Sequence, residues 1–115
     1  MNEQEILEAI CKMPEEFYSS GNHSMMELLD KSGYRSAKES ITEKEIENYL
    51  NKNQSLFQFW LQHSENTRSA PAWYLTQENS NWVVGIYPDG SQSQFTNKYQ
   101  ACARYIKNYL ESLIG

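Results

Sequence analysis

The stretch NWVVGIYPDG at residues 81–90 limits the possible folds more than any other part of the chain. It is dense in β-branched and aromatic residues and ends in Pro-Asp-Gly, which is typical of a strand that enters a hairpin. Trp82, Val84 and Ile86 share one face at the period of two, and Val83 lies on the other. Both faces are partly apolar, so we predict the central strand of a sheet, with Trp82 buried.

Two further strands and a helix complete the predicted C-terminal half. Residues 72–77 alternate apolar and polar side chains, and residues 91–95 return after the turn, which predicts an antiparallel meander of three strands. Thr96 or Asn97 is expected to cap a final helix over residues 97–114. An apolar stripe at helical spacing runs along that helix: Tyr99, Cys102, Ala103, Ile106, Leu110 and Leu113.

The N-terminal 66 residues predict a cluster of helices. An amphipathic helix ends before Pro14, where a short second helix begins. Capping boxes predict a helix over residues 24–32 and another that starts at Thr42. Residues 34–40 are polar and mixed, which predicts a loop. Residues 55–64 are apolar around most of a helical circumference, which predicts a largely buried helix.

Elements of one type therefore run together along the chain: helices, then strands, then one helix. This order predicts an α+β fold. At 115 residues the chain has about the length of one ordinary domain. We predict a single domain over residues 1–115, with a helical part at 1–66, the β-meander at 72–95 and the C-terminal helix at 97–114.

The formal net charge is −5, and the acidity lies in the N-terminal half. Residues 1–66 hold six Lys or Arg against twelve Asp or Glu, whereas residues 67–115 hold four against three. A negative surface repels phosphate backbones and attracts basic proteins. We therefore expect no direct binding of nucleic acid. The acidity predicts either a basic protein partner or a surface charge that serves solubility alone.

The N-terminus lacks the basic start and apolar core of a signal peptide. No apolar run approaches the roughly 20 residues that span a bilayer. We therefore expect a cytoplasmic protein with no membrane partner. Cys11 and Cys102 lie far apart in the sequence and are expected to be buried thiols.

Familiar catalytic and cofactor motifs are missing from the sequence: there is no nucleophile elbow, zinc-protease motif or phosphate loop. His23 and His63 stand apart from other metal-ligating residues and are expected to be exposed beside helices. We therefore expect no metal, no cofactor and no enzymatic activity. A small hydrolase that uses His63 with Glu65 is the least favoured alternative.

Carboxylates on the predicted N-terminal helices are the candidate partner-binding residues. Glu43 and Glu47 share one helical face, where like charges weaken the helix unless a cation is near. A basic partner would relieve this repulsion, and so would Lys44 together with the helix N-terminus. Tyr34 is a candidate aromatic anchor. The predicted partner-binding residues are Glu15, Glu16, Glu27, Asp30, Tyr34, Glu39, Glu43 and Glu47.

Aromatic and turn positions in the C-terminal half carry a resemblance. They are Phe59-Trp60, Thr67-Arg68-Ser69, Ala72-Trp73-Tyr74, Trp82-Val83-Val84-Gly85-Ile86-Tyr87, Phe95 and Gln100-Ala101-Cys102-Ala103-Arg104-Tyr105-Ile106. This pattern resembles the immunity proteins of contact-dependent growth inhibition and related polymorphic toxin systems of bacteria. The resemblance implies a cytoplasmic, non-enzymatic inhibitor of a toxin domain, often a nuclease, that a neighbouring cell delivers. It implies scaffold roles for Trp73, Trp82, Phe95 and Cys102.

We therefore expect a monomeric immunity protein that binds and neutralises a cognate basic toxin. A nuclease is expected because a domain that holds a polyanion is usually basic. The alternative is a general interaction adaptor whose sheet edge pairs with a peptide. A toxin reading frame immediately upstream would favour immunity, and its absence would favour the adaptor.

Overall fold

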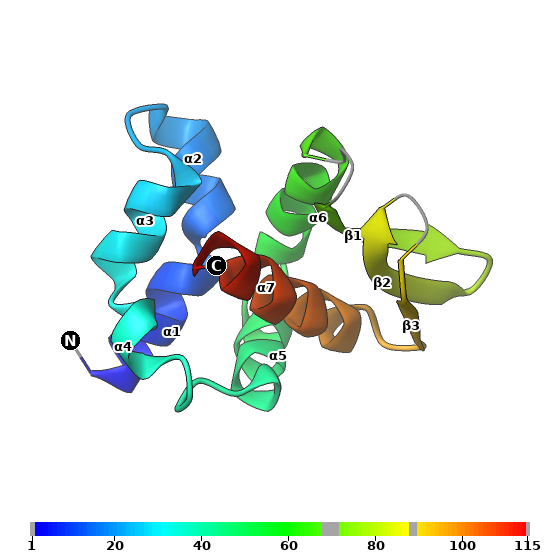
Figure 1. Ribbon diagram of the computed structural model, residues 1–115. Coiled ribbons are helices and arrows are strands. Elements are labelled where there is room, and N and C mark those ends of the chain that lie inside the picture. Colours follow the sequence, from blue (N-terminus) through cyan, green and yellow to red (C-terminus); the bar gives the residue numbers. More distant parts are fainter. Residues whose placement is uncertain (1, 68–71, 88–89, 115) are drawn as a thin grey trace.

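The last helix, α7 (Lys98–Ile114), lies at the centre of the fold, between the sheet and the other helices (Figure 1). Residues 2–67, 72–87 and 90–114 of this computed structural model are described. Helix α7 contacts all three strands on one side and helices α5 (Glu43–Lys52) and α6 (Leu56–Asn66) on the other. The order of elements is the predicted α+β order, with N-terminal helices, an antiparallel sheet and a C-terminal helix.

The sheet consists of β1 (Ala72–Glu78), β2 (Asn81–Tyr87) and β3 (Gln92–Phe95), in the order β1-β2-β3. Both pairings are antiparallel. β2 is therefore the central strand, as the sequence predicts. The predicted turn residues Pro88 and Asp89, and Arg68 and Ser69 of the resemblance, lie outside the described residues.

The centre of β2 is buried on both of its faces. Val84 joins the helical core on one face, and Val83, which is 0% exposed, lies on the opposite face. Trp82 differs from the expectation because it is half-buried: its ring packs edge-on against Phe57, with 5.2 Å between ring centroids. The fully buried tryptophan is Trp60 on α6, whose Nε1 donates to the Cys11 carbonyl at 2.9 Å.

The N-terminal helices are α1 (Glu3–Cys11), α2 (Met13–Ser20), α3 (Met25–Ser32) and α4 (Tyr34–Ala37). Ser24 and Thr42 form the predicted capping boxes of α3 and α5. Asn97 caps α7, since its Oδ1 accepts from the backbone N–H groups of residues 99 and 100. These local signals were sufficient to predict where the three helices begin.

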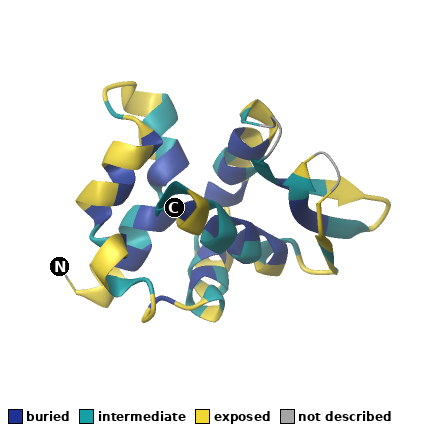
Figure 2. Cartoon of the chain, viewed as in Figure 1, coloured by how far each residue is buried: buried dark blue, intermediate teal, exposed yellow. Residues whose placement is uncertain are grey.

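The predicted loop at residues 34–40 is wrong in part, because the short helix α4 occupies its first half. Gly33 ends α3 with φ of 82°, and Ser32 Oγ then accepts from the Tyr34 N–H at 3.1 Å. Figure 2 shows exposed residues along the outer sides of α2 and α3 and at the β1–β2 turn. No helix within the described ranges is long and apolar enough to cross a bilayer.

Candidate functional site

Several predicted partner-binding carboxylates already form ion pairs with Lys or Arg side chains of the same chain. Glu43 Oε1 accepts from Arg104 Nε on α7 at 2.7 Å. Lys44 Nζ lies 3.6 Å from Glu47 Oε2. The repulsion between Glu43 and Glu47 is therefore offset by cations of the same chain. This like-charge pair gives no reason to expect a partner at α5.

The two predicted carboxylates on α3 are also engaged. Asp30 Oδ1 accepts from Arg35 Nε at 2.7 Å. Glu27 accepts from the Ser24 N–H and lies 3.4 Å from His23 Nδ1. The backbone hydrogen bond from Ser24, with a further contribution from His23, lowers the pKa of Glu27. These acids serve the local structure of α3 and α4.

Glu15, Glu16 and Glu39 differ from the others because they form no ion pair within the described residues. Glu15 and Glu16 lie in the first turn of α2, and Glu39 follows α4. Figure 1 separates α2 and α4 at opposite ends of the N-terminal helical layer. Residues 3–20, which span α1 and α2, contain five Glu and one Lys. Residues 3–20 therefore carry an excess of four carboxylates over cations, and Glu16 shares the lining of one pocket with Lys12 and Lys31.

Tyr34, the predicted aromatic anchor for a partner, is 0% exposed, so its ring offers no surface to a partner in this fold. Its hydroxyl accepts from Lys107 Nζ on α7 at 2.8 Å. The same ammonium group donates to the carbonyls of Lys38 and Ile41, each at 2.6 Å. Burial raises the pKa of Tyr34. Tyr34 and Lys107 together fix the segment between α4 and α5 against α7.

His63 was expected at the surface, but it is 2% exposed between α2, α6 and α7. Its Nδ1 lies 3.1 Å from the Tyr18 hydroxyl, which also accepts from Asn66 Nδ2 at 3.1 Å. Burial lowers the pKa of His63 to about 4, so the ring is neutral at pH 7. Glu65 is exposed and lies two residues further along α6, on another side of the helix. The structure does not bring together the pair required by the hydrolase alternative.

Aromatic rings surround His63. Trp60 and Tyr109 both meet it edge-on, with centroid distances of 6.1 Å and 5.0 Å. Tyr105 stacks on Tyr109 at 5.9 Å. Within the described residues, His63 Nε2 is buried without a hydrogen-bond partner. Burial, with the nearby Tyr18, raises the pKa of Tyr109 to about 12.

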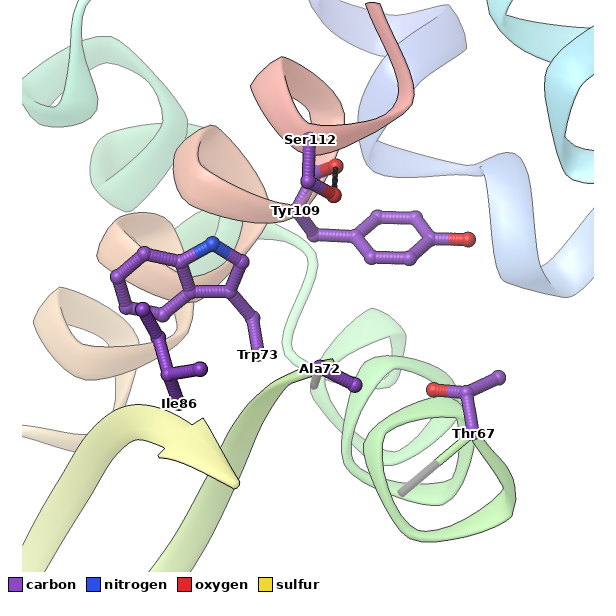
Figure 3. A pocket seen from close by; sticks show the side chains of 6 residues that line it. All are labelled: Thr67, Ala72, Trp73, Ile86, Tyr109 and Ser112. Carbon is purple, nitrogen blue, oxygen red and sulfur yellow. Dashed lines mark hydrogen bonds between the residues drawn. The ribbon is translucent and has the colours of Figure 1, made fainter. Parts of the chain in front are cut away.

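A pocket of about 380 Å³ lies beside this cluster (Figure 3). It lies where the end of α6 meets β1, β2 and the C-terminal part of α7. Thr67, Ala72, Trp73, Ile86, Tyr109 and Ser112 line it. This pocket could not be predicted from the sequence because its walls come from three separate segments spread over residues 67–112. A signal was present in Trp73, an aromatic residue at the start of a predicted strand.

The described residues contain no group of three or more His, Cys, Asp or Glu side chains that could hold a metal ion. Cys11 and Cys102 are both buried. Burial raises the pKa of the Cys11 thiol to about 12 and that of the Cys102 thiol well above its usual value. Both are therefore protonated thiols at pH 7 and poor nucleophiles.

No family model matches the sequence, and neither a curated protein nor a solved structure matches the chain.

Proposed function

We propose that this chain is a cytoplasmic, non-enzymatic immunity protein that binds a basic toxin domain, such as a nuclease, and neutralises it as a monomer. The observation that supports this most is the excess of five Glu over one Lys along residues 3–20. A basic partner that approaches this surface gains electrostatic attraction before contact, which raises the association rate.

The distribution of ion pairs narrows the predicted contact set. Glu43, Asp30 and Glu47 hold cations of their own chain, so a partner would have to replace those contacts. Glu15 and Glu16 carry no such pair within the described residues and are consecutive residues in the first turn of α2. They are therefore the carboxylates from which binding would gain most.

The first experiment is co-purification of this protein with the product of the reading frame immediately upstream. The proposal predicts a stable complex, and it predicts that co-expression restores growth to cells that express the upstream protein. No complex and no protection from that protein would contradict the immunity function.

A variant pair then locates the interface. Glu15→Lys/Glu16→Lys should weaken the complex and the protection from the toxin. Glu65→Lys/Glu78→Lys is the matched control, because it makes the same change of charge at two exposed positions outside α1 and α2. Equal loss in both variants would show that net charge, rather than the α2 surface, determines binding.

The open sheet edge favours one second function, a peptide-binding adaptor. Ser64 Oγ accepts from the Leu75 N–H at 2.7 Å and donates to the Leu75 carbonyl at 3.1 Å, so α6 closes the outer edge of β1 there. Leu75 pairs with Val84, and backbone groups alternate in direction along each strand. The backbone groups of Gln92 and Gln94 therefore face the free edge of β3, where an extended peptide could add a strand.

The variant Gln94→Pro tests the adaptor function, since it removes an N–H group that the sheet itself does not use. Binding of a partner through β3 would be lost in Gln94→Pro and retained in Glu15→Lys/Glu16→Lys. The opposite pattern would contradict the adaptor and support the acidic surface.

A further inference from the structure

The pocket beside the aromatic cluster has walls of mixed character. The Trp73 indole and Ile86 form one side, and Tyr109 on α7 forms another (Figure 3). Ser112 on α7, with Ala72 and Thr67 at the junction of β1 and α6, completes the described lining. A volume of about 380 Å³ falls in the range of small-molecule sites, which are mostly apolar and contain a few polar groups. The pocket therefore has the size and composition to hold one substituted aromatic ring.

Neighbouring rings hold the Tyr109 wall in place. Tyr109 stacks on Tyr105 at 5.9 Å and meets the buried His63 edge-on at 5.0 Å. A wall fixed in this way needs little ordering when a ligand binds, which favours affinity.

The polar groups of the lining can both accept and donate hydrogen bonds. Thr67 Oγ1 donates its proton to the His63 carbonyl at 2.8 Å, and Ser112 Oγ donates to the Tyr109 carbonyl at 2.6 Å. Both hydroxyl oxygens therefore keep lone pairs that can accept from a ligand. Trp73 adds an indole N–H, which is a donor only, and Figure 3 shows its nitrogen on the ring edge nearer α7.

We propose that this pocket binds a small aromatic molecule that carries a hydroxyl or ring N–H group, of the phenol or indole type. The apolar and aromatic walls suit the ring. A hydroxyl group on the ligand can donate to Thr67 or Ser112 and accept from the Trp73 N–H. This site is separate from the acidic surface of α1 and α2, so its test does not depend on the immunity function.

The test is an NMR titration of the ¹⁵N-labelled protein with phenol, and with toluene as a ligand of the same shape that lacks the hydroxyl. The Trp73 indole N–H signal reports on the pocket. The Trp60 indole N–H, which donates to the Cys11 carbonyl in the core, is the internal reference. We expect a saturable shift of Trp73 with phenol and binding of toluene that is about threefold to tenfold weaker, as for one or two lost hydrogen bonds.

Two variants control for the position of the site. Ala72→Leu fills the pocket and should reduce phenol affinity at least about tenfold while the thermal unfolding transition is retained. Ser112→Ala, at an exposed position, should lower the affinity for phenol about threefold and leave the affinity for toluene unchanged. If Ala72→Leu does not fold, Ser112→Ala alone tests whether phenol binds in this pocket. A Trp73 shift that does not saturate, or phenol affinity unchanged in whichever of these variants folds, would overturn the proposal.

Discussion

Acidification should destabilise this protein through one buried side chain, His63. Burial holds the pKa of its imidazole at about 4, whereas the ordinary value is 6.5. Between these two pH values the unfolded chain binds a proton that the folded chain does not bind. The stabilising contribution is therefore complete above pH 6.5 and is lost as the pH falls from 6.5 towards 4. The difference between these two pKa values corresponds to about 3 kcal/mol of unfolding free energy.

The assay is urea unfolding of the wild type and of His63→Phe at a series of pH values between 7.5 and 4. Phenylalanine keeps an aromatic ring between α2, α6 and α7 but does not titrate. The variant loses the contact with Tyr18, so we expect it to be less stable than the wild type at neutral pH. On acidification, the difference in unfolding free energy should shift in favour of the variant by about 3 kcal/mol.

The matched control is His23→Gln, which removes the partly exposed histidine beside Glu27. It should keep the steep loss of stability that His63 causes. A difference between wild type and His63→Phe that stays constant from pH 7.5 to 4 would refute the reasoning. It would mean that the imidazole is protonated at the same pH in the folded and unfolded chains.

Three further predictions concern stability and are checked by urea unfolding at pH 7. Lys107→Met removes the ammonium group that joins α7 to the segment between α4 and α5, and it should cost about 2 to 3 kcal/mol; Lys44→Met, at an exposed ion pair, should cost less than about 1 kcal/mol. Trp60→Ala should cost about 3 to 5 kcal/mol, and Trp82→Ala should cost less because Trp82 is half-buried. Gly85→Ala would place a Cβ 2.9 Å from a tyrosine hydroxyl across the strand pair, so it should destabilise by about 1 to 3 kcal/mol. Equal losses of unfolding free energy in the two lysine variants or in the two tryptophan variants, or an unchanged stability of Gly85→Ala, would contradict the energetic roles given to these residues.

The features that the sequence could predict depend on short stretches of chain. The capping boxes at Ser24 and Thr42 and the cap at Asn97 involve residues two or three positions apart. The meander follows from alternation within each strand and from turn chemistry between strands. Such signals predict the element order and most boundaries because the same few residues both carry the pattern and form the structure.

The features that the sequence could not predict depend on contacts between distant segments. Tyr18 and His63 are 45 residues apart, and only their contact shows that this histidine is internal. Glu43 and Arg104 are 61 residues apart, so the ion pair that offsets the acidity of α5 could not be predicted from helical spacing. Tyr34 follows a helix-ending glycine in a polar segment, which gave no sign of burial.

The central claim, that the acidic surface of α1 and α2 receives a basic partner, is tested most directly by the association rate with the upstream protein at several salt concentrations. We predict that the rate falls steeply with added salt. We also predict that Glu15→Lys/Glu16→Lys lowers it about tenfold or more at low ionic strength, whereas Glu65→Lys/Glu78→Lys changes it much less. An association rate that is insensitive to salt, or equal in the two variants, would contradict the claim.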